Sequence, residues 1–308
     1  MQGEAACSVG DQEERMRIGV GLPTNLAGIG GADVLGWARG ADEGPFSAIG
    51  VLDRNVYDTH EPLISLAAAA AVTTRVRLLT SIVLAPTRET TLLARQAATL
   101  DAQSGGRLVL GLGIGIRDDD YRATGQDFHA RGRRLESQLP VLRRIWAQEP
   151  LGEGLGVVGP APARPGGPTL YIGGYTPKTA ARIARYADGF MAPGGGEPAA
   201  IAALWAQIET AWEEAGRTGR PGWTASSYYA LGPEAEDFAR AYIMRTYAFD
   251  PALAERRLRT IPLGEDAVRD VVRRQADMGA DEILLRPVAA DIGQLHRLAD
   301  LAAGLAAA

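Results

Sequence analysis

Apolar positions along the chain switch repeatedly between two patterns, which alternate in order. Short stretches are apolar at nearly every position, and longer stretches place apolar residues at the spacing of a helix face. The short stretches predict strands over 16–23, 46–53, 75–84, 108–115, 169–174, 189–193, 222–231 and 281–287. The longer ones predict helices over 32–44, 61–75, 89–106, 130–148, 176–188, 197–216, 234–259, 263–280 and 291–308. This order is expected of parallel strands joined by crossover helices.

The expected strands lack polar alternation, as strands covered by helices on both faces should. An eightfold strand–helix repeat in 308 residues predicts an α/β fold, a (β/α)8 TIM barrel. A doubly wound sheet is the alternative, but it rarely needs eight strands in one domain. We expect one barrel domain over 16–308, with a short insertion near 149–168 and a helical, substrate-side insertion near 234–262. Residues 1–15 have no apolar segment typical of a signal peptide and predict a disordered leader.

Charge and composition narrow the partners to small molecules. The net charge of −5 comes without a basic stripe, which argues against nucleic acid and anionic membranes as partners. No apolar run is long enough to span a bilayer. Cys7 is the single cysteine, which excludes an internal disulfide and suits a reducing cytoplasm. The three histidines lie on separate predicted elements, so we expect no metal site.

In a TIM barrel the chemistry lies where the strands end at their carboxyl termini. The residues at these expected ends are Thr24, Asn25, Asp53, Arg54, Asn55, Ser81, Ile82, the glycines between 111 and 115, residues 173–178, 193–196 and 226–229, and Arg286.

The stretch LVLGLGIGIRDDD (108–120) carries glycine at every second position. It is not a dinucleotide fingerprint, because Ile116 occupies the third glycine position and three aspartates follow. Alternate glycines remove the side chains from one strand face, so Gly111 and Gly113 are expected to clear a wall for a flat ligand. Tight packing inside the barrel is the alternative.

A better phosphate site is IGGYTPKTAAR (172–182), where an expected strand meets Gly173 and Gly174 and a helix follows. Thr176 can cap this helix and Pro177 suits its first position, which leaves amides free for an anion beside Lys178. An ordinary capped helix is the alternative.

These stretches, together with 61–115, 131–146 and 170–190, resemble the bacterial-luciferase-like flavin and deazaflavin oxidoreductases. The resemblance implies a TIM barrel that binds coenzyme F420 or reduced FMN in its mouth. It places Ser81 and Ile82 at a bulge behind the ring, often with a cis peptide bond. It also assigns cofactor contacts to Gly111, Gly113, Gly173, Gly174, Tyr175 and Thr176, and matches Asp53 to a motif at the end of the second strand. We expect Asp53 and Lys178 to contact the cofactor as well.

Two departures from the family pattern limit the reaction. Arg54 follows Asp53 where histidine is common, and Ile116 stands where sugar-phosphate-oxidising members carry glutamate. We therefore expect an enzyme that uses reduced F420 to transfer hydride to an unsaturated organic substrate, with Arg54, Asn55 or Tyr57 orienting it or donating a proton. The alternatives are an FMNH2-dependent monooxygenase served by a separate cofactor reductase, and a non-catalytic flavin-binding protein. The resemblance also allows a homodimer.

Overall fold

Parallel strands close into a barrel in the computed structural model, which describes residues 16–307. The strands are β1 (Arg17–Gly21), β2 (Ala48–Val51), β3 (Arg77–Thr80), β4 (Val83–Leu84), β5 (Leu108–Gly113), β6 (Thr169–Gly173), β7 (Gly189–Met191), β8 (Gly222–Tyr229) and β9 (Glu282–Pro287). β3 and β4 share one barrel position, because both pair with β5. The barrel therefore has eight positions and confirms the predicted (β/α)8 fold. The leader expected over 1–15 lies outside the described residues.

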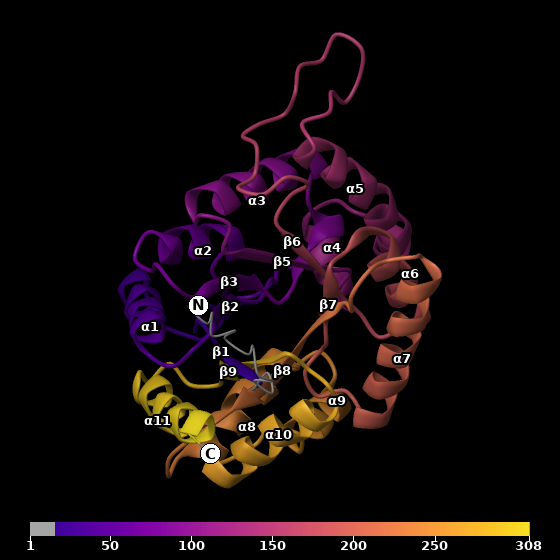
Figure 1. Ribbon diagram of the computed structural model, residues 1–308. Coiled ribbons are helices and arrows are strands. Elements are labelled where there is room, and N and C mark those ends of the chain that lie inside the picture. The colour runs from indigo at the N-terminus through magenta and orange to yellow at the C-terminus, as the bar shows by residue number, and fades with distance from the viewer. Residues whose placement is uncertain (1–15, 308) are drawn as a thin grey trace, which may run out of the picture.

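Helices surround the strands as a ring (Figure 1). They are α1 (Gly31–Glu43), α2 (Pro62–Ala70), α3 (Thr90–Gln103), α4 (Asp118–Ala123), α5 (Arg131–Trp146), α6 (Pro177–Tyr186), α7 (Pro198–Glu214), α8 (Ala235–Thr246), α9 (Pro251–Leu258), α10 (Glu265–Asp277) and α11 (Gly293–Ala307), with the 3-10 turns η1 (Ala85–Thr87) and η2 (Phe128–Ala130). Proline at the first position starts α2, α6, α7 and α9, where its missing N–H costs little. No helix that the structure describes is long and apolar enough to cross a membrane.

The amino-terminal end of the barrel is closed by a buried ion pair. Glu282, at the start of β9, is fully buried and accepts hydrogen bonds from the Arg77 Nη2 at 2.5 Å and from the Ser47 hydroxyl. Above this floor, an apolar layer fills the barrel interior: Ala48, Leu79, Val109, Tyr171 and Met191, with Ile82 packed against it. The filled interior leaves the carboxyl ends of the strands as the open end.

A second apolar cluster fixes α8 and α9 beside this open end. Its buried members are Leu26, Ala230, Ala235, Ala239, Tyr242, Ile243, Ala254, Ile261 and Val288, from both helices and from the loops after β1, β8 and β9. The segment expected as a substrate-side insertion is thereby held to the barrel.

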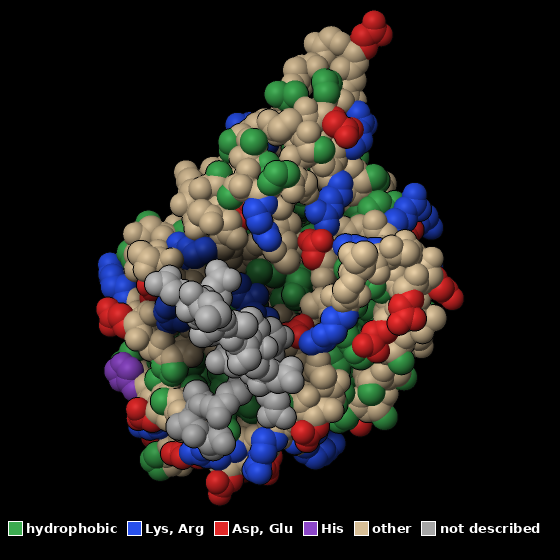
Figure 2. All heavy atoms as spheres, in the orientation of Figure 1, with side chains coloured by type: hydrophobic (Ala, Val, Ile, Leu, Met, Phe, Trp, Pro, Cys, Tyr) green, Lys and Arg blue, Asp and Glu red, His purple; other side chains and the backbone are tan. Residues whose placement is uncertain are grey.

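Between α5 and β6 the chain makes a long excursion without helix or strand, which projects from the body (Figure 1). Figure 2 shows the same projection on a face where acidic and basic side chains are intermixed. This part of the surface has no field of a single sign.

Candidate active site

Two adjoining cavities lie at the carboxyl ends of the strands. The larger, about 370 Å³, is lined by four arginines and by the ends of β5 to β9, and we call it the arginine cleft. The smaller, about 190 Å³, is lined by Tyr57, Tyr228, Tyr242, Tyr247 and Phe249, and we call it the tyrosine pocket. Ser81, Ile82, Gly115, Ile116, Tyr228 and Tyr247 line both cavities. The two cavities are therefore continuous, so a ligand in the arginine cleft would lie next to any ligand in the tyrosine pocket.

The boundary between the cavities is the bulge between β3 and β4. The peptide bond between Ser81 and Ile82 is cis, as the family resemblance implied. The Ser81 amide donates to the carbonyl of Val51 at 2.7 Å, and the Ser81 carbonyl accepts from the Arg286 Nη1 at 3.2 Å. The bulge is thus held from both sides, by β2 and by β9.

Both glycines of β5 make room for the chain at β3 and at the bulge. A Cβ on Gly111 would lie 2.1 Å from the Thr80 carbonyl oxygen, and a Cβ on Gly113 would lie 2.8 Å from the Ile82 Cδ1. Gly113 lines the arginine cleft, but Gly111 does not. Thr80 and Ile82 therefore occupy the space that these glycines leave, and the cofactor contact of Gly111 stays a prediction that this packing does not support.

The turn from β6 into α6 forms one wall of the arginine cleft. Gly173, Gly174, Tyr175 and Thr176 all line the cleft, as predicted. Thr176 occupies the cap position, but its side chain makes no capping hydrogen bond. Pro177 carries no N–H and the Thr179 amide donates to the Thr176 carbonyl at 2.8 Å, so the Lys178 amide is the donor of this first turn that remains available to an anion. The Lys178 side chain is exposed and does not line the cleft, so its cofactor contact stays a prediction that this geometry does not support.

Three arginines that the sequence did not indicate supply positive charge to the cleft, which the Lys178 side chain does not line. Arg131 starts α5, Arg182 lies in α6 and Arg257 in α9, and all three line the cleft with Arg286. Arg182 pairs with Glu136 at 2.7 Å. Arg257 donates from its Nη1 to the Gly194 carbonyl at 2.5 Å, and Gly195 gives it room, since a Cβ there would lie 2.2 Å from that nitrogen. No spacing signal could have found three residues that come from three separate helices.

The three predicted catalytic residues lie in the loop after β2, and two of them line the tyrosine pocket. Arg54 and Tyr57 line the tyrosine pocket, where the guanidinium lies 4.9 Å from the ring centre. Asn55 does not line this pocket. Its backbone N–H donates to the Asp120 carboxylate at 2.8 Å, and its side-chain amide donates to the Thr87 hydroxyl at 3.2 Å. Asn55 therefore stabilises the loop, and its contact with the substrate stays a prediction that this geometry does not support. The buried Asp120 also pairs with Arg54 at 3.3 Å, which fixes that side chain.

Asp53 lines the tyrosine pocket rather than the arginine cleft. Its carboxylate accepts from the Leu84 amide and from the Arg88 Nη2, both at 2.9 Å. Burial raises the pKa of Asp53, against the opposing charge of Arg88. These contacts tie the end of β2 to β4 and to the loop before α3, so Asp53 supports the bulge from behind.

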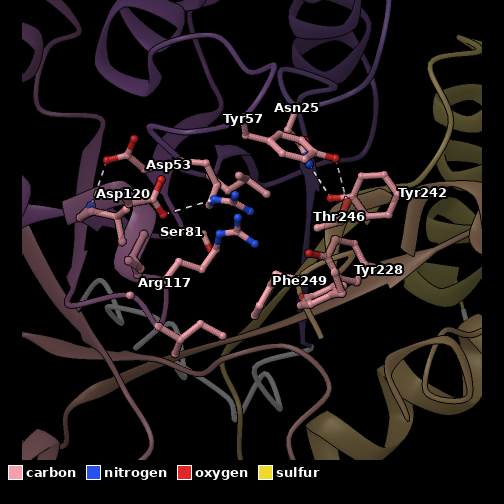
Figure 3. Close-up of a pocket in the computed structure, with 17 residues that line it drawn as sticks. Asn25, Asp53, Tyr57, Ser81, Arg117, Asp120, Tyr228, Tyr242, Thr246 and Phe249 are labelled. Carbon is pink, nitrogen blue, oxygen red and sulfur yellow. Dashed lines mark hydrogen bonds and ion pairs between the residues drawn. The ribbon is translucent and has the colours of Figure 1, made fainter. Parts of the chain in front are cut away.

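The far wall of the tyrosine pocket comes from β8 and from the end of α8. Figure 3 shows Tyr228, Tyr242, Thr246 and Phe249 facing Asp53, Asp120 and Ser81 across the pocket. The Tyr57 hydroxyl lies 2.9 Å from the Thr246 hydroxyl and joins the two walls. The segments 116–129 and 240–262 both contribute lining residues.

The arginine cleft fits the phosphate-bearing tail of a flavin or deazaflavin. Within the described residues its lining includes no carboxylate, and the Nε atoms of Arg131, Arg182 and Arg257 are buried without a hydrogen-bond partner. Four guanidinium groups beside the amino-terminal end of α6 are donors suited to phosphate. Among residues 16–307 no cluster of His, Cys, Asp and Glu could hold a metal ion.

Solved structures with this fold include several oxidoreductases. Monooxygenase RslO1 from Streptomyces bottropensis aligns over 94% of this chain and 98% of its own, with a TM-score of 0.76 and 23% identity. An F420-dependent secondary alcohol dehydrogenase, solved with an F420-acetone adduct, aligns over 91% and 95%, with a TM-score of 0.75 and 17% identity. At these identities the likeness shows the fold alone.

Two sequence relatives come from Mycobacterium tuberculosis (strain ATCC 25618 / H37Rv). The uncharacterized proteins Rv0940c and Rv0953c are each 34% identical to this chain, over 165 and 174 residues. The alignments cover 51% and 53% of this chain, and 56% and 60% of the relatives, so they span little more than half of either relative.

The family match is broader than either of these alignments. The model of the family described as luciferase-like monooxygenase matches residues 16–306, which is nearly the whole described chain. It covers the barrel, the bulge at Ser81 and the segments that line both cavities. The chain therefore belongs to the luciferase-like monooxygenase family of oxidoreductases, as its sequence motifs indicated.

Proposed function

We propose that this chain is an oxidoreductase that uses reduced coenzyme F420 to transfer hydride to an unsaturated organic substrate. The observation that carries the proposal is the arginine cleft, which is rich in guanidinium groups, free of carboxylates among its described lining residues, and open to the tyrosine pocket across the Ser81–Ile82 bulge. This arrangement suits an anionic cofactor whose reactive end faces a separate substrate site.

The chain's own residues divide the task of holding the cofactor. The amides of Gly174 and Tyr175 and the start of α6 suit the phosphate, with Arg131, Arg182 and Arg257 as charged donors. The bulge at Ser81 and Ile82, together with Gly113, gives the wall against which the ring would lie. When bound, reduced F420 supplies a hydride and so brings the reactivity, while the protein positions the partners.

The number of arginines favours F420 over FMN. Both cofactors carry a phosphate, but F420 continues beyond it into a tail with further carboxylates. Three arginines from α5, α6 and α9, beside the amides of α6, exceed what one phosphate needs. A longer anionic tail would use these additional donors.

The tyrosine pocket favours a flat, largely apolar substrate. Five aromatic side chains line it, and such side chains offer large contact areas to a planar molecule. Arg54 and Arg117 also line the pocket, and Arg117 lies 4.2 Å from the centre of the Phe249 ring. A conjugated carbonyl compound is the substrate type that this lining suits, with Arg54 orienting its oxygen.

Thermal unfolding with FMN and with F420, each in both redox states, tests the proposal. A ligand that binds the folded chain raises its melting temperature by mass action. We expect F420 to raise it more than FMN, and Arg131→Gln or Arg257→Gln to weaken F420 binding about tenfold, since each variant loses a charge-assisted hydrogen bond. Lys178→Gln is the matched control, because Lys178 lies outside the cleft.

The other outcomes of this experiment are equally informative. A shift with FMN alone would replace the proposal by the monooxygenase alternative, in which a separate reductase supplies the reduced cofactor. The absence of a shift with either compound would refute both and leave a non-catalytic protein. If F420 binds, anaerobic oxidation of its reduced form by conjugated carbonyl compounds measures the hydride transfer directly.

A further inference from the structure

The junction of the two cavities contains few groups that can supply a proton. Six residues line both cavities, and only Ser81, Tyr228 and Tyr247 among them carry an exchangeable side-chain proton. A reduction that adds a hydride to one atom of a double bond needs a proton at the other atom, close to where the two molecules meet. The donor is therefore to be sought among these three hydroxyls.

Arg286 places a positive charge beside one of them. Its guanidinium carbon lies 5.0 Å from the centre of the Tyr228 ring. The Nη1 donates to the Ser81 carbonyl at 3.2 Å and the Nη2 to the Ser226 hydroxyl at 3.1 Å. Within the described residues Arg286 has no carboxylate partner. This half-buried charge is thus free to stabilise an anion that forms next to it.

The position of Arg286 is set by its surroundings. The Ser226 hydroxyl donates a hydrogen bond to the Ala192 carbonyl at 2.9 Å, so its oxygen is left to accept from the Arg286 Nη2. Gly21 on β1 provides the space for the aliphatic part, because a Cβ there would lie 2.7 Å from the Arg286 Cγ. The guanidinium is therefore held in place and does not have to be recruited during the reaction.

Two further tyrosines face Tyr228 from α8 and from the loop after it. The Tyr228 and Tyr242 rings meet edge to face with their centres 5.2 Å apart, and Tyr247 lines both cavities together with Tyr228. The Asn25 side-chain amide donates to the Tyr242 hydroxyl (Figure 3). The Tyr242 and Tyr247 hydroxyls are neighbours that can donate toward the Tyr228 oxygen, and such donors favour its negatively charged form.

We propose that Tyr228 is the catalytic proton donor, and that Arg286 is the positioning residue that stabilises the tyrosinate formed in the step. The inference rests on the proposed function. The substrate double bond gains a hydride at one atom from the reduced cofactor. Its electron pair takes the proton of Tyr228 at the other atom, while the O–H bond breaks. The tyrosinate then recovers a proton from solvent, so the substrate gains two electrons and two protons.

The charged and titratable groups around Tyr228 distinguish it from the other hydroxyls. Arg286 on β9, Arg257 on α9, Tyr242 and Tyr247 face it. Burial alone would raise the pKa of Tyr228, but the charge of Arg286 and the neighbouring Tyr242 and Tyr247 hydroxyls outweigh burial and lower it. Burial raises the pKa of Tyr247. Among the two tyrosines at the junction, Tyr228 is therefore the one that releases its proton more easily.

A tyrosinate titration of the whole protein, followed by ultraviolet absorbance, tests the pair without substrate. We expect the wild-type curve to contain a step below the usual tyrosine pKa of about 10. This step should vanish in Tyr228→Phe, move to higher pH in Arg286→Gln and be partly restored in Arg286→Lys. Tyr186→Phe, in α6, is the control that should leave it in place. A Tyr228→Phe curve without loss of an early step would overturn the inference.

Single-turnover oxidation of reduced F420 tests the role in catalysis, with 2-cyclohexen-1-one as the probe. We expect Tyr228→Phe to slow the oxidation about 100-fold, the scale of general acid catalysis, while its affinity for F420 stays at the wild-type value. The wild-type rate should fall as pH rises through the pKa of Tyr228. An unchanged rate in Tyr228→Phe refutes the donor alone. Failure of the wild type to bind F420 or to reduce the probe refutes the proposed function and the donor role with it.

Discussion

Replacing Gly111 by alanine tests whether the glycines of β5 serve the chain or a ligand. The new Cβ would lie 2.1 Å from the Thr80 carbonyl oxygen, against an ordinary carbon–oxygen contact of about 3.3 Å. One of the two strands must therefore move by about 1 Å. Thr80 resists this movement, because its hydroxyl donates to the Gly111 carbonyl and accepts from the Gly111 amide, both at 2.8 Å. Overpacking of a core costs about 1–3 kcal/mol, and we expect Gly111→Ala to lose about 3 kcal/mol.

Urea unfolding of three glycine variants measures this cost. Gly113→Ala meets only the flexible end of Ile82, so we expect a loss of about 1 kcal/mol. Gly36→Ala is the matched control: Gly36 lies exposed in α1 with no atom near the new Cβ, and alanine should stabilise the helix by about 0.5–1 kcal/mol. The reasoning is refuted if Gly111→Ala is as stable as the wild type and loses only cofactor binding, because the glycine would then serve the ligand.

One prediction concerns the buried ion pair at the amino-terminal end of the barrel, and another concerns the pH dependence of stability at Asp42. Glu282→Gln removes the buried carboxylate that pairs with Arg77. Because Arg77 is partly exposed, we expect the free energy of urea unfolding to fall by about 2–3 kcal/mol. The control Asp270→Asn, in an exposed pair, should change this free energy by less than about 0.5 kcal/mol. Burial opposes ionisation of Asp42, but hydrogen bonds from the Thr74, Arg75 and Val76 amides outweigh it and lower its pKa to about 2. The ionised carboxylate therefore stabilises the fold above pH about 4, and this stabilisation is lost between pH about 4 and about 2. In acid unfolding, the free energy of unfolding of Asp42→Asn should therefore change less with pH over that window than that of the wild type.

The fold could be predicted from the sequence because strands that are buried on both faces are apolar at nearly every position. The strand expected over 222–231 and the helix expected over 263–280 both appear in the structure, as β8 and α10. The strand expected over 75–84 was only partly right, since β3 and β4 are separated by the Ser81–Ile82 bulge. The short helix α4 was missed because its first turn, Asp118 to Asp120, is acidic and carries no apolar period.

The site was less predictable, because local sequence cannot tell where a side chain points. Lys178 follows the glycine turn directly, yet it faces outward, whereas Arg257 reaches the cleft from a distant helix. Asn55 and Arg54 are neighbours, and only Arg54 lines the pocket, since Asp120 binds the backbone at Asn55. Such outcomes depend on hydrogen bonds between segments that are far apart in the chain.

The pairing of Tyr228 with Arg286 could not be predicted from the sequence, because it depends on which strands are neighbours and in what register. Tyr228 and Arg286 both lie at strand ends, where a TIM barrel places its chemistry, so the sequence could locate them but could not assign them a role. Their pairing arises because β8 and β9 are neighbours in register, with Tyr228 opposite Arg286. The register brings a tyrosine and an arginine to the same edge of the barrel, and the bulge at Ser81 then supplies the carbonyl that orients the guanidinium. The chemistry at this junction is therefore a consequence of strand pairing, and a change that shifts the bulge should alter the titration of Tyr228 without touching either residue.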